Sequence, residues 1–102
     1  MNTKEIEVAG QKYKIRKMTL GIRQQFMKLQ RDGADANELE AFIIYNCVVE
    51  PKFESIEKAK ELDFDVADEL SWQISDFSKP SEDFLRRSAN LLSQATSTPK
   101  TQ

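Results

Sequence analysis

The chain has 102 residues, the usual size of one domain, and its 39% hydrophobic and 31% charged residues are enough for one modest core. Its 15 basic and 17 acidic residues are interleaved and leave a net charge of −2, so they provide no electrostatic footprint for nucleic acid or an anionic membrane. The lack of histidine and the single cysteine, Cys47, exclude zinc sites of the Cys/His type and an internal disulfide.

The same features indicate where the protein works. Residues 1–7 include three charged residues and do not resemble a signal peptide. The longest apolar run, residues 42–49, is interrupted by Asn46 and is far shorter than the ~20 residues that span a bilayer. A lone cysteine is typical of a reducing compartment. We therefore expect a cytoplasmic protein without membrane contact.

Residues 4–17 predict a β-hairpin. Apolar and charged residues alternate over residues 5–8 and again over residues 13–16. Between them, Gly10 and Gln11 suit a two-residue type II′ turn, which favours glycine at its first position.

This register predicts one apolar face. It places Val8 opposite Tyr13 and Ile6 opposite Ile15. An isolated hairpin is marginal in water, so the apolar face is expected to pack on helices, on another subunit, or on both.

The remainder of the chain predicts four to five helices. Thr19 and Ser81 are suitable N-caps, and Asp35 with Glu38 forms a relative of the capping box. The expected helices run over residues 19–30, 35–49, 55–62, from 63 or 65 to 77, and from 81 onward. The second is apolar nearly all round, which is typical of a central helix buried on several sides.

The predicted fold class is therefore mainly α: a small helical bundle with an N-terminal β-hairpin. A single domain is expected over residues 1–95. Residues 96–102 are polar and are expected to form a disordered tail.

Few residues could carry chemistry. The acidic cluster at Asp63, Asp65, Asp68 and Glu69 lacks the glycine and the terminal glutamate of a calcium loop, and carboxylates favour a helix N-terminus. Cys47 has no histidine to activate it and lies in an apolar helix, which favours a core cysteine. We expect no enzyme, no metal and no cofactor.

Contacts with other proteins are the remaining role. Trp72 lies outside the apolar stripe of its helix. It could therefore pack at the edge of the core or anchor a contact with another protein, since Trp is enriched in interface hot spots. Phe53 and Phe64 flank turns and have the same two interpretations. The candidate protein-binding residues are Ile6, Val8, Tyr13, Ile15, Phe53, Phe64 and Trp72.

Three segments carry a resemblance to a known family. The apolar helix of residues 42–49 ends in a Val-x-x-Pro step at Pro51, a later helix has the pattern Leu70-x-x-x-Ile74, and Met-Thr-Leu-Gly at residues 18–21 leads into the first helix. This arrangement, over most of residues 5–80, resembles the tail assembly chaperones of long-tailed bacteriophages.

The resemblance implies a function without catalytic residues. Such chaperones bind the tape-measure protein in the host cytoplasm, present it to the major tail protein and are absent from the mature virion. Many are also made in a longer, frameshifted form. Self-association through the hairpin or the central helix is expected, because repeated weak contacts can line a long helical client. The alternatives are a structural virion component such as a head–tail connector subunit and, more remotely, a small DNA-binding regulator or an enzyme.

Overall fold

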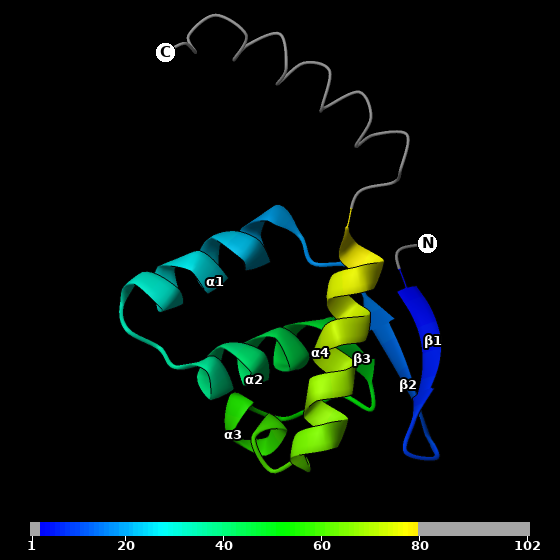
Figure 1. The fold of residues 1–102 in the computed structure, drawn as a ribbon. Helices are drawn as coiled ribbons and strands as arrows, with labels where there is room; N and C mark the ends of the chain where they lie inside the picture. The colour runs from blue at the N-terminus through cyan, green and yellow to red at the C-terminus, as the bar shows by residue number, and fades with distance from the viewer. Residues whose placement is uncertain (1–2, 80–102) are drawn as a thin grey trace, which may run out of the picture.

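The computed structural model describes residues 3–79, which form a small antiparallel sheet beside a group of helices (Figure 1). The elements in chain order are β1 (Thr3–Val8), β2 (Gln11–Arg16), α1 (Leu20–Arg31), α2 (Ala36–Cys47), β3 (Val48–Glu50), α3 (Ile56–Ala59) and α4 (Phe64–Ser78). Helix α4 packs against α2 and against the inner face of the hairpin, while α1 packs mainly on α2. The helix predicted from Ser81 onward and the tail at 96–102 lie outside the described residues.

The expected fold class, mainly α, is wrong: the fold is α+β. Helix α2 ends at Cys47, and the next residues form β3 rather than the last turn of the helix. β3 pairs antiparallel with β2, which completes a sheet in the order β1-β2-β3. β-branched Val48 and Val49 favour an extended backbone, and Pro51 disfavours helix at the residue before it.

The predicted hairpin is confirmed, but its register is wrong by two residues. Ala9 and Gly10 form the loop, with φ of 53° and 81°, and positive φ at both positions defines a type I′ turn. The inward-facing cross-strand pairs are Val8 with Gln11, Ile6 with Tyr13 and Lys4 with Ile15. Because a shift of two residues preserves side-chain parity, the same residues still face inward.

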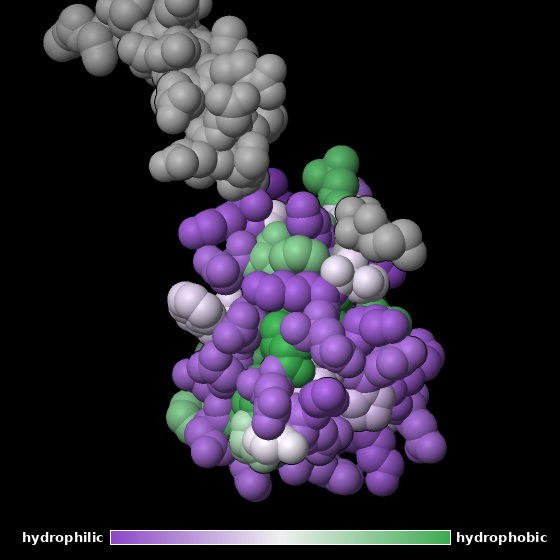
Figure 2. Space-filling view, turned by 90° about the vertical axis from the view of Figure 1, so that its right-hand side faces the viewer, coloured by the Kyte–Doolittle hydropathy of each residue, from purple (hydrophilic) through white to green (hydrophobic). Residues whose placement is uncertain are grey.

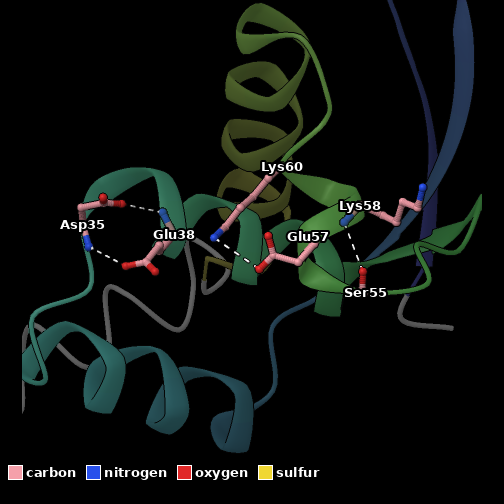
Figure 3. Close-up of polar contacts among 6 residues, drawn as sticks. All are labelled: Asp35, Glu38, Ser55, Glu57, Lys58 and Lys60. Carbon is pink, nitrogen blue, oxygen red and sulfur yellow. Dashed lines mark hydrogen bonds and ion pairs between the residues drawn. The ribbon is translucent and has the colours of Figure 1, made fainter.

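The predicted helix starts at Thr19, Asp35 and Ser55 are confirmed. Thr19 Oγ1 accepts a hydrogen bond from the Ile22 amide at 3.2 Å. Asp35 and Glu38 form a reciprocal capping box with distances of 2.9 and 3.2 Å (Figure 3). Ser55 Oγ accepts from the Lys58 amide at 3.2 Å, as the same view shows. Each cap satisfies a backbone donor that the first turn leaves without a partner.

The core lies between the sheet, α2 and α4. Its largest fully buried side chains are Ile15, Ile44, Leu70, Ile74 and Cys47. Fully burying an aliphatic side chain of this size contributes roughly 1.5–3 kcal/mol relative to leaving it exposed. The expectation that the second helix is central is confirmed, since five of its residues are buried.

Candidate functional site

Most of the candidate protein-binding residues pack inside this chain. Val8, Tyr13 and Ile15 are 7%, 5% and 0% exposed and belong to the core. Ile6 and Phe53 are partly buried and pack against the same core. Their apolar surface stabilises this chain and leaves little of it for another protein.

Phe64 and Trp72 are accessible, but they face different directions. Both lie on α4, and they are 74% and 61% exposed. At 100° per residue, the separation of eight positions places Trp72 about 80° around the helix from Phe64. Phe64 lies on the face of α4 that turns toward α1, together with Ser71 and Ser75. Trp72 lies outside that face, so the structure does not bring all the candidate residues together.

An apolar groove, which we name the α1–α4 groove, runs between α1 and α4 with α2 beneath it. It consists of two adjoining hollows of about 560 and 350 Å³, which share Phe26, Ile43 and Ser75. The first is lined by Met18, Thr19, Leu20, Arg23, Phe26, Met27, Gln30, Ile43, Ser75 and Ser78. The second is lined by Phe26, Ala36, Asn37, Leu39, Glu40, Ile43, Phe64, Asp68, Ser71 and Ser75.

The groove is open because α1 packs mainly on α2. No residue of α1 is fully buried, and its stripe at Ile22, Phe26 and Leu29 is only partly covered. Leu20 and Met27 lie on the rim, 79% and 44% exposed. Within residues 3–79, five large hydrophobic side chains are exposed, and three of them, Leu20, Met27 and Phe64, line this groove. This exposed apolar surface makes the groove the candidate interaction site.

Charges at the groove are separated along its length. Arg23 lines the hollow at the C-terminal end of α4, and Glu40 and Asp68 line the hollow at its N-terminal end. Ser71 Oγ donates to Glu40 Oε2 at 2.8 Å, which ties α4 to α2 across the floor. At the other end, Ser78 Oγ accepts from the Met18 amide at 2.9 Å, which anchors the start of α1 to α4. Helix α4 is thus held near both ends of the groove, to α2 at one end and to the segment before α1 at the other.

Most of the surface that lines the groove is apolar, and its few ionisable groups lie toward its two ends. Within residues 3–79, no group of three or more His, Cys, Asp or Glu side chains gathers as a metal site. Cys47 is fully buried, and burial raises the pKa of its thiol to about 11, an effect that the nearby Arg16 charge partly opposes. A thiol held protonated in this way is a poor nucleophile at neutral pH.

The outer face of the hairpin has a different character. Seen from the hairpin side, the surface is mostly hydrophilic, with apolar residues in scattered positions (Figure 2). Charged residues of opposite sign pair across the strands, Glu5 with Lys14 and Glu7 with Lys12. Lys14 also lies 3.8 Å from Glu50 of β3. Exposed pairs of this kind contribute little stability and keep the face solvated.

The sequence reasoning did not find the groove residues on α1. Leu20 and Met27 are seven residues apart, so they lie on one side of the helix, away from the stripe at Ile22, Phe26 and Leu29. Two large apolar residues outside the packed stripe were the available signal. Ile43 of the floor lies in the second helix, which was expected to be buried on several sides, and it is 9% exposed.

These features define a class: a small α+β domain with an open apolar groove between two helices. No family model, no curated protein and no solved structure matches the chain. Within residues 3–79, no helix has both the length and the apolar character needed to cross a membrane.

Proposed function

We propose that this chain is a non-catalytic tail assembly chaperone of a long-tailed bacteriophage, which holds an apolar helical stripe of the tape-measure protein in the α1–α4 groove. The observation that carries the proposal is the open groove itself, with Leu20, Met27 and Phe64 exposed along it. The identity of the client follows from the resemblance of residues 18–21, 42–51 and 70–74 to that family.

The shape of the groove suits a helix. It follows α4, whose 15 residues span roughly 22 Å at 1.5 Å per residue. A client helix of about four turns could therefore lie along it and insert side chains at helical spacing, as in other helix-in-groove complexes. Each large apolar client side chain that becomes buried would contribute about 1.5–3 kcal/mol before the cost of ordering the complex.

A tape-measure protein is long and presents many such stripes. A single weak contact would become effective when several copies bind neighbouring stripes of one client. In this proposal the protein acts in the host cytoplasm, presents the client to the major tail protein and is absent from the finished virion.

Self-association through the hairpin would use its strand edge rather than its inner face or the central helix. The inner face of the hairpin and most of α2 are buried within the chain. The outer edge of β1 is unpaired in the described sheet, and sheet edges are sites of strand addition. Because Val8 and Gln11 close the two-residue loop, the backbone groups of Glu5 and Glu7 point outward along that edge. An antiparallel copy of β1 would then bring glutamates together, which disfavours β1–β1 pairing and favours a basic strand.

Co-expression with the candidate tape-measure protein tests the function. The wild-type chain should keep that protein soluble and co-purify with it. A Leu20→Asp/Met27→Asp variant places charge on the groove rim at exposed positions, so it should fold and lose both effects. Val49→Asp is the matched control, since Val49 is 37% exposed on β3 and lies outside the groove lining.

Two results would overturn the proposal. One is an insoluble tape-measure protein in the presence of the wild-type chain. The other is a groove variant that performs as well as Val49→Asp. Mass spectrometry of purified virions provides a further test, because a stoichiometric amount of the chain in the particle would instead indicate a structural virion component.

A further inference from the structure

Two opposite charges on the α1–α4 groove are available to a bound partner. Arg23 lines the hollow beside Ser78, at the C-terminal end of α4, and Asp68 lines the other hollow. Both residues are exposed, and within residues 3–79 neither belongs to an ion pair. The second carboxylate of the acidic end, that of Glu40, accepts a hydrogen bond from Ser71 at 2.8 Å and keeps its charge.

The two ends of the groove lie about three helical turns apart. Asp68 precedes Ser78 by ten residues in α4, which corresponds to roughly 15 Å at 1.5 Å per residue. A client helix that lies along α4 covers this distance in about ten or eleven residues. Its positions i and i+11 lie on the same side, because eleven steps of 100° end only about 20° beyond three full turns. The separation of the charges therefore matches one face of a helix.

Apolar surface fills the interval between the charges. Leu20, Phe26 and Met27 contribute to it from α1, and Ile43 contributes from α2. A helix bound here would place its apolar stripe against these side chains and one polar position against each charged end. Two like charges at those positions would set one of them against a like charge on the groove, which costs affinity.

We infer that the α1–α4 groove selects a bipolar helix, which we define as a helix with an apolar stripe between an acidic and a basic side chain about eleven positions apart. The acidic side chain lies near Arg23, and the basic one lies near Asp68 and Glu40. A helix with its acidic residue first lies antiparallel to α4, and one with its basic residue first lies parallel to it. The groove thus selects the spacing of opposite charges rather than the chain direction.

This inference rests on the proposed function, because it takes the groove to bind a helix. It adds which helices of a client are bound. Apolar helices whose two end charges are alike gain one ion pair in the groove and lose the benefit to one repulsion, so they bind no better than uncharged helices.

Four synthetic peptides test the inference on the full-length chain. Each has leucine at positions i+3, i+4, i+7 and i+8 in an alanine and glutamine background, with both termini capped. They differ only at i and i+11, which are Glu with Lys (the bipolar peptide), Gln with Gln, Glu with Glu, or Lys with Lys. Titrations followed by ¹H–¹⁵N NMR give the dissociation constants, and shifts at the amides of Leu20 and Met27 locate binding in the groove.

The bipolar peptide should bind about 4-fold more tightly than the Gln/Gln peptide, because each of two exposed ion pairs contributes about 2-fold. Each like-charged peptide should bind no more tightly than the Gln/Gln peptide. About 0.5 M sodium chloride should remove most of the advantage of the bipolar peptide, because salt screens exposed charges.

Reversing one charge of the groove should redirect the selection. Arg23→Glu makes both ends acidic at an exposed position, so the Lys/Lys peptide should become the tightest binder and the bipolar peptide should lose its advantage. Lys28→Glu is the matched control, because it makes the same change of net charge on the same helix outside the groove lining. With this control the bipolar peptide should remain the tightest binder. The NMR spectrum of each variant establishes that it is folded.

The outcomes separate the inference from the proposed function. Equal affinities of the bipolar and Gln/Gln peptides overturn the inference alone, and so does a preference for the bipolar peptide that persists in Arg23→Glu. Shifts of the groove amides that grow with protein concentration in the absence of peptide would show that a second copy occupies the groove, which also overturns selection of a client helix. If none of the four peptides shifts the groove amides, helix binding by the groove fails, and both the inference and the proposed function are overturned.

Discussion

The turn of the hairpin provides a sharp test of the fold, through Ala9. Its φ of 53° lies in the left-handed region. This region costs an L-residue other than glycine, asparagine or aspartate roughly 1–2 kcal/mol. Glycine avoids the steric cost but loses roughly 0.5–1 kcal/mol more backbone entropy on folding. Ala9→Gly should therefore raise the free energy of unfolding by about 0.5–1 kcal/mol, the difference between these two effects.

Ala9→Asn should stabilise the protein by about 1 kcal/mol. Asparagine tolerates the left-handed region without the entropy loss of glycine, and Asn-Gly is the preferred type I′ dipeptide. Urea unfolding followed by circular dichroism measures the free energy of unfolding of both variants. If only stability has altered, the slope of that free energy against urea concentration stays the same. The matched control is Ala36→Gly, at an exposed helical residue that starts α2, which should lose up to about 1 kcal/mol.

The sign of the effect distinguishes the two hairpin registers. If Gly10 and Gln11 formed a type II′ turn, Ala9 would be in an extended strand, where glycine and asparagine are both unfavourable. Destabilisation by both substitutions at Ala9 would therefore refute the type I′ turn, and with it the pairing of Ile6 with Tyr13.

Three further predictions concern the caps, the core and the junction of the hairpin with α4. Asp35→Ala removes half of the capping box and should lower the free energy of unfolding by about 1 kcal/mol in urea titrations. Burial raises the pKa of Cys47 to about 11 from an ordinary value near 9, so the folded state holds the proton more tightly. The resulting stability is present below pH 9 and is lost as the pH rises toward 11, by at most about 2–3 kcal/mol. The Cys47→Ala variant should lack this part of the pH dependence. If the free energy of unfolding fell equally steeply with pH in both proteins, the assignment to Cys47 would be contradicted. The Phe77 ring lies 5.7 Å from Lys4 Nζ and 5.4 Å from Lys17 Nζ. Phe77→Leu should therefore cost about 1–2 kcal/mol, and a cost below about 0.5 kcal/mol would show that these cation–π contacts do not hold the hairpin to α4.

Local chemistry explains which elements could be predicted from sequence. Thr19, Asp35 and Ser55 each satisfy a backbone donor three residues ahead, so their effect depends only on neighbours in the chain. The hairpin was likewise predictable, because alternation of apolar and charged residues has the period of a strand. The resemblance, in contrast, concerned identity and provided no information on register or on the groove.

Long-range pairing explains where the prediction was wrong. Residues 42–49 are apolar enough to continue a helix, but Val48 is 3% exposed because it lies opposite Ile15 in the sheet. The turn is type I′ although Gly10 suits the first position of a type II′ turn, and the resulting register sets Lys4 opposite Ile15. The end of the helix depends on a contact between segments more than 30 residues apart, and the turn type depends on the summed pairing of two strands. Neither is contained in a local sequence pattern.

The sequence by itself determined the helix caps, the existence of the hairpin and the apolar residues available for a core, because each depends on the chemistry of adjacent residues. Only the tertiary structure decided which apolar residues remain exposed. Val8, Tyr13 and Ile15 became core because α2 and α4 cover the inner face of the sheet. Leu20, Met27 and Phe64 remained exposed because α1 packs mainly on α2 and leaves a groove beside α4. Whether a side chain is buried depends on which residues pack against it, and those residues come from distant segments that meet only in the folded structure.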